Sequence, residues 1–145
     1  MNRFSKVIDD LFYNLTLSEI KITNEKQDEL TQNTMLYKKI ICKESGKHTI
    51  SSIAKLLSVA TTAVTQKVNE LEKKNYITRQ QSLEDKRISY LCRVDKECKC
   101  LEEELKRDKY VLEKLKEKYS EKELENFINT FEYMNTQYKK YDEGN

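Results

Sequence analysis

The side chains that most often carry catalysis are scarce in this chain of 145 residues. It holds one histidine, His48, and two distant glycines, Gly46 and Gly144. A serine–histidine–aspartate triad would depend on His48 alone, and a cage of several histidines around a metal ion cannot form within one chain. Phosphate loops need closely spaced glycines, and neither common motif can be written with these two. We therefore expect no enzyme, no metal and no cofactor.

The four cysteines offer little redox or metal chemistry. Cys98 and Cys100 are two residues apart, so on a helix they point about 200° away from each other and cannot share a metal ion or a disulfide. Cys42 follows two isoleucines and is expected to be a small buried apolar residue, and Cys92 falls in a predicted strand. A redox switch and a metal site stay as weaker alternatives.

The hydropathy of the chain and the composition of its first 15 residues indicate the cellular compartment in which we expect it. No apolar run reaches the roughly 20 residues of a membrane helix, and charged residues interrupt the apolar ones in the first 15 residues, unlike a secretory signal. We expect a cytoplasmic protein with reduced cysteines.

The distribution of charge points to a different activity, which is binding to phosphates. Residues 55–93 contain eight basic and four acidic side chains, whereas the whole chain has a net charge of only +2. The remainder of the chain is therefore slightly acidic. A basic segment between acidic arms is typical of a surface that contacts nucleic acid.

The elements that would position this basic segment are mostly helices. The chain has no proline and only two glycines, whereas folds made of many strands need both residues in their turns. Apolar residues recur at helical spacing from Phe4 to Leu15. A second helix is expected from an N-cap at Thr31 to about Glu44, with Met35, Leu36, Ile40 and Ile41 facing inward and Gly46 as a left-handed stop.

The middle of the chain predicts a helix-turn-helix followed by a hairpin. Two short helical patterns lie between Thr49 and Leu71, and residues 57–60 leave room only for a sharp turn between them. Strand-like runs follow at residues 76–80 and 88–94, separated by a polar loop. A helix-turn-helix with such a hairpin is a winged helix.

Two long helices are predicted for the C-terminal part of the chain. Asp95 is a candidate N-cap for the first, on which Cys98 is expected to be buried, and Ser120 with Glu123 has the spacing of a capping box for the second. The apolar stripes on the terminal helices most simply indicate packing against a second copy, while an intramolecular bundle is the alternative.

The run ISSIAKLLSVATTAVTQKVNELEKKNYITRQQSLEDKRISYL resembles the winged helix of the MarR family of bacterial transcription regulators. The most specific elements are residues 71–74, which read Leu-Glu-Lys-Lys, and residues 85–87, which read Asp-Lys-Arg. The fold implied is mainly α with a small β-hairpin wing, in which terminal dimerisation helices flank the winged helix-turn-helix domain. The expected domains are residues 1–30, a dimerisation helix and linker, 31–94, the DNA-binding domain, and 95–145, the C-terminal dimerisation helices.

Three positions depart from the family pattern. Asn75 stands where the family often has glycine, and asparagine tolerates the left-handed conformation. Ala60 cannot cap a helix, so Thr61 or Thr62 is expected to cap it one residue later. Val94-Asp95 falls about one residue late after the wing, which predicts a bulge or an altered register in the second strand.

The resemblance and the helical spacing together assign the interface with double-stranded DNA. The recognition helix would place its N-terminal half in the major groove, and Arg87 would enter the minor groove with Asp85 holding it. The expected DNA-binding residues are Thr61, Thr62, Thr65, Gln66, Lys67, Asn69, Arg79, Asp85, Lys86 and Arg87. Ordinary solvated polar residues are the alternative interpretation.

The resemblance also implies a homodimer and a small-molecule effector. The expected dimerisation residues are Phe4, Ile8, Leu11, Phe12, Leu15, Phe127, Phe131, Met134 and Tyr138. Phe12, Tyr13 and Tyr37 are the candidate effector-binding residues, for which an ordinary core role is the favoured alternative.

The leading hypothesis is a dimeric transcriptional regulator, with repression as its expected mode, on a palindromic operator. The alternative from another class is a helical protein-interaction module that has kept this fold and lost DNA binding. The weak cap at Ala60 and the small net charge favour that alternative slightly.

Overall fold

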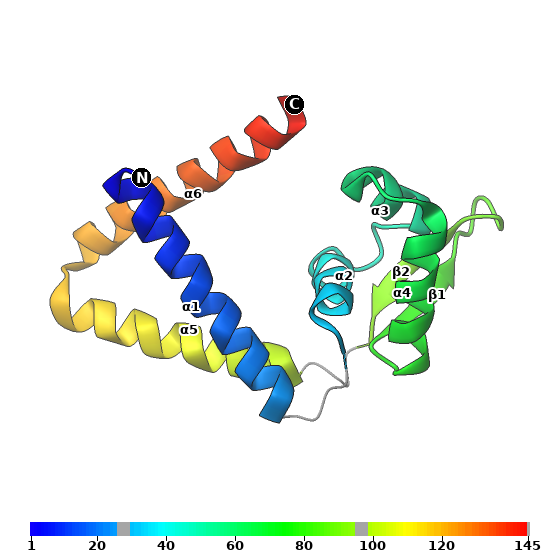
Figure 1. Ribbon diagram of the computed structural model, residues 1–145, viewed down its shortest axis with the longest axis horizontal. Helices are drawn as coiled ribbons and strands as arrows, with labels where there is room; N and C mark the ends of the chain where they lie inside the picture. The colour runs from blue at the N-terminus through cyan, green and yellow to red at the C-terminus, as the bar shows by residue number, and fades with distance from the viewer. Residues whose placement is uncertain (26–29, 95–98, 145) are drawn as a thin grey trace. The chain divides into compact units, whose positions relative to one another are not determined.

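The computed structural model describes residues 1–25, 30–94 and 99–144, and it is mainly helical with one β-hairpin, as predicted (Figure 1). The elements in chain order are α1 (Arg3–Glu25), α2 (Gln32–Lys43), α3 (Ile50–Leu57), α4 (Thr61–Lys73), β1 (Ile77–Gln81), β2 (Ser89–Arg93), α5 (Lys99–Lys118) and α6 (Glu121–Gly144). Two predictions, the N-cap at Asp95 and a buried Cys98, lie outside the described residues. The chain forms two compact units, residues 1–101 and 102–145.

The hydrophobic core of the first unit joins α2, α3, α4 and the hairpin. Each element contributes apolar side chains that are almost fully buried, and the hairpin contributes one from each strand. The largest of them are Ile41, Ile53, Val64, Val68, Leu71, Ile77 and Leu91. Because α4 buries Val64, Val68 and Leu71 on one side, its opposite side is left to solvent.

The start and the end of α2 follow the predicted signals. The Thr31 hydroxyl accepts a hydrogen bond from the Thr34 backbone N–H, and Gly46 has a φ of 81°, a left-handed conformation that favours glycine. Ile41 is fully buried, but Leu36 is 56% exposed, so its predicted inward orientation is wrong. The inward face of α2 instead includes Thr34 and Tyr37, both of which are buried.

The helix-turn-helix is fixed by one capping box and one left-handed turn. At the start of α3 the Thr49 hydroxyl accepts from the Ser52 N–H, while the Ser52 hydroxyl oxygen accepts from the Thr49 N–H. Ser58 ends α3 in the left-handed conformation. Ala60 then precedes α4 without any side-chain cap, so the predicted one-residue delay of this helix is wrong.

The hairpin is regular along its whole length. Five residue pairs align β1 with β2, from Ile77 opposite Arg93 to Gln81 opposite Ser89. The predicted bulge in the second strand is therefore wrong. The loop before α3 anchors β2, because the Leu91 N–H donates to the His48 carbonyl at 2.8 Å and the Gly46 N–H donates to the Leu91 carbonyl at 2.9 Å.

Leu71→Ala should destabilise the winged helix strongly. The Leu71 side chain is fully buried where α4 meets the hairpin, and truncation of a buried leucine costs about 2–5 kcal/mol because it leaves a cavity. Urea unfolding would measure this loss. Leu36→Ala is the matched control because the Leu36 side chain on α2 is exposed, so we expect its stability to change by no more than about 0.5 kcal/mol. Equal losses for both variants would contradict the assigned core.

The terminal helices leave large apolar side chains exposed in the single chain. On α1, Phe4 and Phe12 are 55% and 61% exposed, and on α6 Phe127 and Phe131 are 52% and 39% exposed. The predicted capping box starts α6, because the Ser120 N–H donates to Glu123 and the Glu123 N–H donates to the Ser120 hydroxyl. In the described part of the chain, every helix is too short or too polar to span a bilayer.

Candidate nucleic-acid interface

The exposed side of α4 carries a row of polar side chains opposite its buried side. Thr62, Gln66 and Asn69 lie on this face and are exposed, as is Thr61 in the first turn. The helical repeat places Thr62, Gln66 and Asn69 opposite Val64, Val68 and Leu71. This surface therefore offers hydroxyl and carboxamide groups, which are the groups that read base edges in a major groove.

Three of the predicted DNA-binding side chains on α4 already have partners within the protein, namely Thr65, Lys67 and Asn69. The Thr65 hydroxyl donates to the Thr61 carbonyl at 2.8 Å, so toward a ligand it offers only an acceptor and its methyl group. The Lys67 ammonium donates to the Thr34 hydroxyl at 3.0 Å and so extends toward α2. The Thr34 hydroxyl in turn donates to the Glu70 carboxylate at 3.0 Å, which forms a polar link between α2 and α4.

Arg79 on β1 is directed back onto α4. Its Nε donates to Glu72 Oε2 at 3.1 Å, and its Nη2 donates to Asn69 Oδ1 at 2.6 Å. The structure thus brings Arg79 and Asn69 together. Thr34, Glu70 and Glu72 are partners that the sequence interpretation missed. For Glu72 the available signal was its position three residues after Asn69, on the same flank of the helix.

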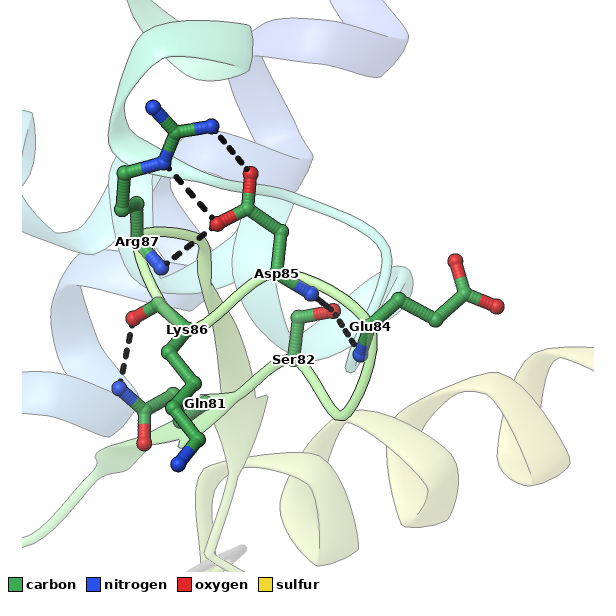
Figure 2. Close-up of polar contacts among 6 residues, drawn as sticks. All are labelled: Gln81, Ser82, Glu84, Asp85, Lys86 and Arg87. Atoms are coloured by element: carbon green, nitrogen blue, oxygen red, sulfur yellow. Dashed lines mark hydrogen bonds and ion pairs between the residues drawn. The ribbon is translucent and has the colours of Figure 1, made fainter.

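The loop between the two strands is closed by its own polar groups (Figure 2). The Ser82 hydroxyl accepts hydrogen bonds from the Glu84 and Asp85 N–H groups at 3.2 and 3.3 Å. The Gln81 side chain donates to the Lys86 carbonyl at 2.6 Å. The loop therefore has a defined conformation, with Lys86 exposed on it.

Asp85 and Arg87 form a two-point pair at this loop (Figure 2). Arg87 Nε donates to Asp85 Oδ1 at 3.1 Å and Nη2 donates to Oδ2 at 3.0 Å, while the Arg87 backbone N–H also donates to Oδ1 at 3.0 Å. The Arg87 side chain is nevertheless 90% exposed. The carboxylate thus orients the guanidinium and leaves most of it accessible to a ligand.

The same pairing fixes the charge states of both groups. The Arg87 side chain, and then its backbone N–H, hold the pKa of the Asp85 carboxyl below its ordinary value, and the carboxylate raises the pKa of Arg87. Because the folded-state pKa of Asp85 is lowered, the pairing is complete at neutral pH and is lost only as the pH falls through that lowered value.

A hollow of about 460 Å³ joins the hairpin to the start of α3. Thr49, the N-cap of α3, and Ser51 in its first turn line one side, and Arg79 and Arg87 line the other side from the hairpin. Ile50, Ile88 and Leu91 also line this hollow, so the two guanidinium groups lie beside apolar side chains there.

Among the effector candidates, Tyr37 is 6% exposed and belongs to the core, whereas Phe12 and Tyr13 on α1 are exposed. Elsewhere in the described residues, Cys42 and Cys92 are half-buried thiols. The described part of the chain contains no group of three or more histidine, cysteine or acidic side chains that could hold a metal ion.

The helix-turn-helix and the adjoining hairpin together define a winged-helix fold. Residues 40–89 match the model of the MarR family. This match includes the helix-turn-helix and much of the hairpin, and it confirms the resemblance to the MarR family predicted from the sequence.

Solved structures share this fold over nearly the whole chain. FabT of Streptococcus pneumoniae, solved in complex with DNA, is 24% identical, and the match covers 93% of this chain and 97% of FabT with a TM-score of 0.64. A MepR mutant from a multidrug resistant S. aureus isolate is 18% identical, with coverages of 94% and 97% and a TM-score of 0.74. A MarR family protein from Bacillus stearothermophilus is 17% identical, with coverages of 96% and 99% and a TM-score of 0.70. A search of curated proteins found no match.

Proposed function

We propose that this protein is a sequence-specific transcriptional regulator of the repressor type that binds double-stranded DNA as a homodimer. The observation that carries the proposal is the exposed polar face of α4 beside a wing that presents Arg87. The DNA complex of FabT, which has the same fold, supports DNA as the ligand. In this proposal α4 lies in the major groove and the hairpin loop lies in the minor groove.

The side chains on α4 divide into base-reading and supporting groups. Gln66, Thr62 and Asn69 are exposed and face away from the core, so they are the proposed contacts to base edges. Lys67 is held by Thr34 at 3.0 Å and acts in this proposal by fixing α4 against α2. The exposed Lys86 on the wing would contact the phosphate backbone instead.

The wing contact depends on the shape of the minor groove. Narrow minor grooves have an enhanced negative potential that attracts arginine. Arg87 is accessible and already oriented by Asp85 at 3.0–3.1 Å, so its insertion costs little side-chain entropy. The Asp85 carboxylate is neutralised by the same pair, which limits its repulsion from DNA.

The proposed dimer would use the apolar faces of the terminal helices. Phe4, Leu11 and Phe12 on α1 and Phe127, Phe131 and Tyr138 on α6 are exposed, and Ile8, Leu15 and Met134 are half-buried. Exposed apolar stripes of this kind mark protein–protein contacts. Two copies related by a dyad would present two recognition helices about one DNA turn apart, which requires a palindromic operator.

Selection of bound fragments from random double-stranded DNA tests this function, followed by affinity measurements over a range of salt concentrations. We expect a palindromic consensus, and a logarithm of the binding constant that falls linearly with the logarithm of salt because lysine and arginine release counterions from phosphates. An absence of any selected sequence, with no salt-dependent binding, would contradict the proposal and support the interaction-module alternative.

A further inference from the structure

We propose that Arg79 is a positioning residue that fixes the Asn69 carboxamide with its amino group toward the DNA, so that Asn69 reads a hydrogen-bond acceptor on a base edge. This inference rests on the proposed function and adds the chemistry that α4 recognises at one position. It assigns Arg79 a role in specificity, in place of a direct contact to DNA.

The geometry places Arg79 between two side chains of α4. Arg79 Nη2 donates to Asn69 Oδ1 at 2.6 Å, and Arg79 Nε donates to Glu72 Oε2 at 3.1 Å. Asn69 and Glu72 are three residues apart and therefore share one flank of the helix. The two contacts hold the guanidinium from two directions, and the Arg79 side chain is only 32% exposed.

The chemistry of the guanidinium decides which way the carboxamide faces. Arginine has donors and no acceptor, so the Asn69 atom that it contacts must be the carbonyl oxygen Oδ1 and not the amino nitrogen Nδ2. An asparagine without such a partner can rotate its carboxamide and offer either group. Here a charge-assisted hydrogen bond at 2.6 Å selects one orientation, with Nδ2 on the side away from Arg79.

The consequence for recognition follows from the base edges of the major groove. Asn69 is exposed on the polar face of α4, and Nδ2 can only donate. Guanine N7 and O6, adenine N7 and thymine O4 are acceptors, whereas the cytosine amino group is a donor. Asn69 should therefore favour the acceptor-bearing bases and disfavour cytosine at the position that it reads.

A direct contact between Arg79 and a DNA phosphate is the competing role. The Glu72 carboxylate compensates the positive charge of Arg79 at 3.1 Å, and about two-thirds of the side chain is covered. A guanidinium that is already paired and partly covered gains less binding free energy from a phosphate than an exposed, unpaired guanidinium does. The two roles differ in what the loss of Arg79 does, because phosphate contacts carry no sequence information.

The test compares the wild type with Arg79→Ala on the selected site and on all of its single-base variants, at several salt concentrations. We expect Arg79→Ala to lower discrimination at one symmetry-related pair of positions by about 2- to 12-fold, the range for one hydrogen bond. The salt dependence should stay unchanged. A uniform loss over all sequences, with a salt slope smaller by about one, would overturn the inference.

Two Asn69 variants change the base preference in ways that a purely structural role of Arg79 would not produce. Asn69→Ala should abolish discrimination at the same positions, and adding Arg79→Ala to it should have no further effect there. Asn69→Asp keeps an acceptor for Arg79 and replaces the outward donor with an acceptor. It should therefore shift the preference toward cytosine, whose amino group donates.

The outcomes also separate this inference from the function on which it rests. If the wild type selects a palindrome but Asn69→Asp keeps the wild-type base preference, the inference is wrong and the function stands. If the wild type selects no sequence, both are wrong. Circular dichroism and thermal unfolding of each variant show that it is folded, and Asn69→Asp serves as the second variant if Arg79→Ala is unstable.

Discussion

Glutamate at both Phe12 and Phe131 should convert the protein into monomers that bind its operator about 10²–10⁴-fold more weakly. Both rings are exposed in the single chain, at 61% and 39%, so a charge there does not disrupt the core of the winged helix. In the proposed dimer the same charges would be buried without partners, which is strongly unfavourable. Affinity falls because, in a dimer, binding of the first recognition helix holds the second one close to its half-site, and a monomer loses this gain in effective concentration. Sedimentation velocity and binding to the selected operator would measure both effects.

Tyr13 and Tyr133 provide a matched control for this prediction. They are aromatic and lie on the same two helices, with exposures of 64% and 68%, but the helical repeat places them away from the apolar stripes that hold Phe12 and Phe131. The double variant Tyr13→Glu and Tyr133→Glu should therefore remain a dimer. Unchanged sedimentation of the Phe12 and Phe131 variant would refute the role of these stripes in dimerisation.

Arg87→Ala should weaken binding to the operator by roughly 5- to 150-fold at fixed salt. The substitution removes an accessible guanidinium that Asp85 holds at 3.0–3.1 Å, and it also leaves the Asp85 carboxylate unpaired beside the DNA. Both effects disfavour the complex, so the loss should exceed that of a simple surface charge. Fluorescence anisotropy with the selected operator would measure it.

Lys86→Ala is the control for charge alone, because it removes one positive charge from the adjacent residue of the same loop. We expect a small loss for it, nearly independent of sequence. The double variant Asp85→Asn and Arg87→Ala separates the two effects: it should recover the part of the loss that arises from the unpaired carboxylate. Equal affinities for wild type and Arg87→Ala would show that the wing does not insert this side chain.

The parts of the fold that local chemistry controls were predictable from the sequence. Thr31 caps α2, Gly46 adopts the left-handed conformation, and Ser120 and Glu123 form their capping box, because each signal acts within about four residues. The buried positions Val64, Val68 and Leu71 followed from helical spacing in the same way.

The errors occurred where tertiary packing overrides a local preference. Ala60 precedes α4 without a cap, because α4 is stabilised by its buried face and by the turn at Ser58. The β1–β2 register stays regular, since Leu91 must be buried and is bonded to the loop at Gly46 and His48. Leu36 is exposed because Thr34 and Tyr37 occupy the inward face of α2.

The composition of the candidate site was predictable, but its internal bonding was not. The sequence marked Lys67, Asn69 and Arg79 as polar residues of one surface. Their partners lie on other elements: Thr34 on α2 for Lys67, and β1 meeting α4 for Arg79 and Asn69. Contacts between residues 10 to 33 positions apart depend on how the elements pack, and no spacing rule within one helix or strand reports them.

A non-glycine residue with a left-handed backbone conformation lies shortly before and shortly after α4. These residues are Ser58, with a φ of 54°, and Asn75, with a φ of 61°. That conformation suits glycine and asparagine, tolerates serine at a cost, and is a severe strain for valine, isoleucine or threonine. A random mutagenesis screen for loss of binding would therefore collect β-branched replacements at 58 and 75. Such substitutions would displace α4 although neither residue contacts a base. Their folding should therefore be measured before either position is assigned to the DNA-binding surface.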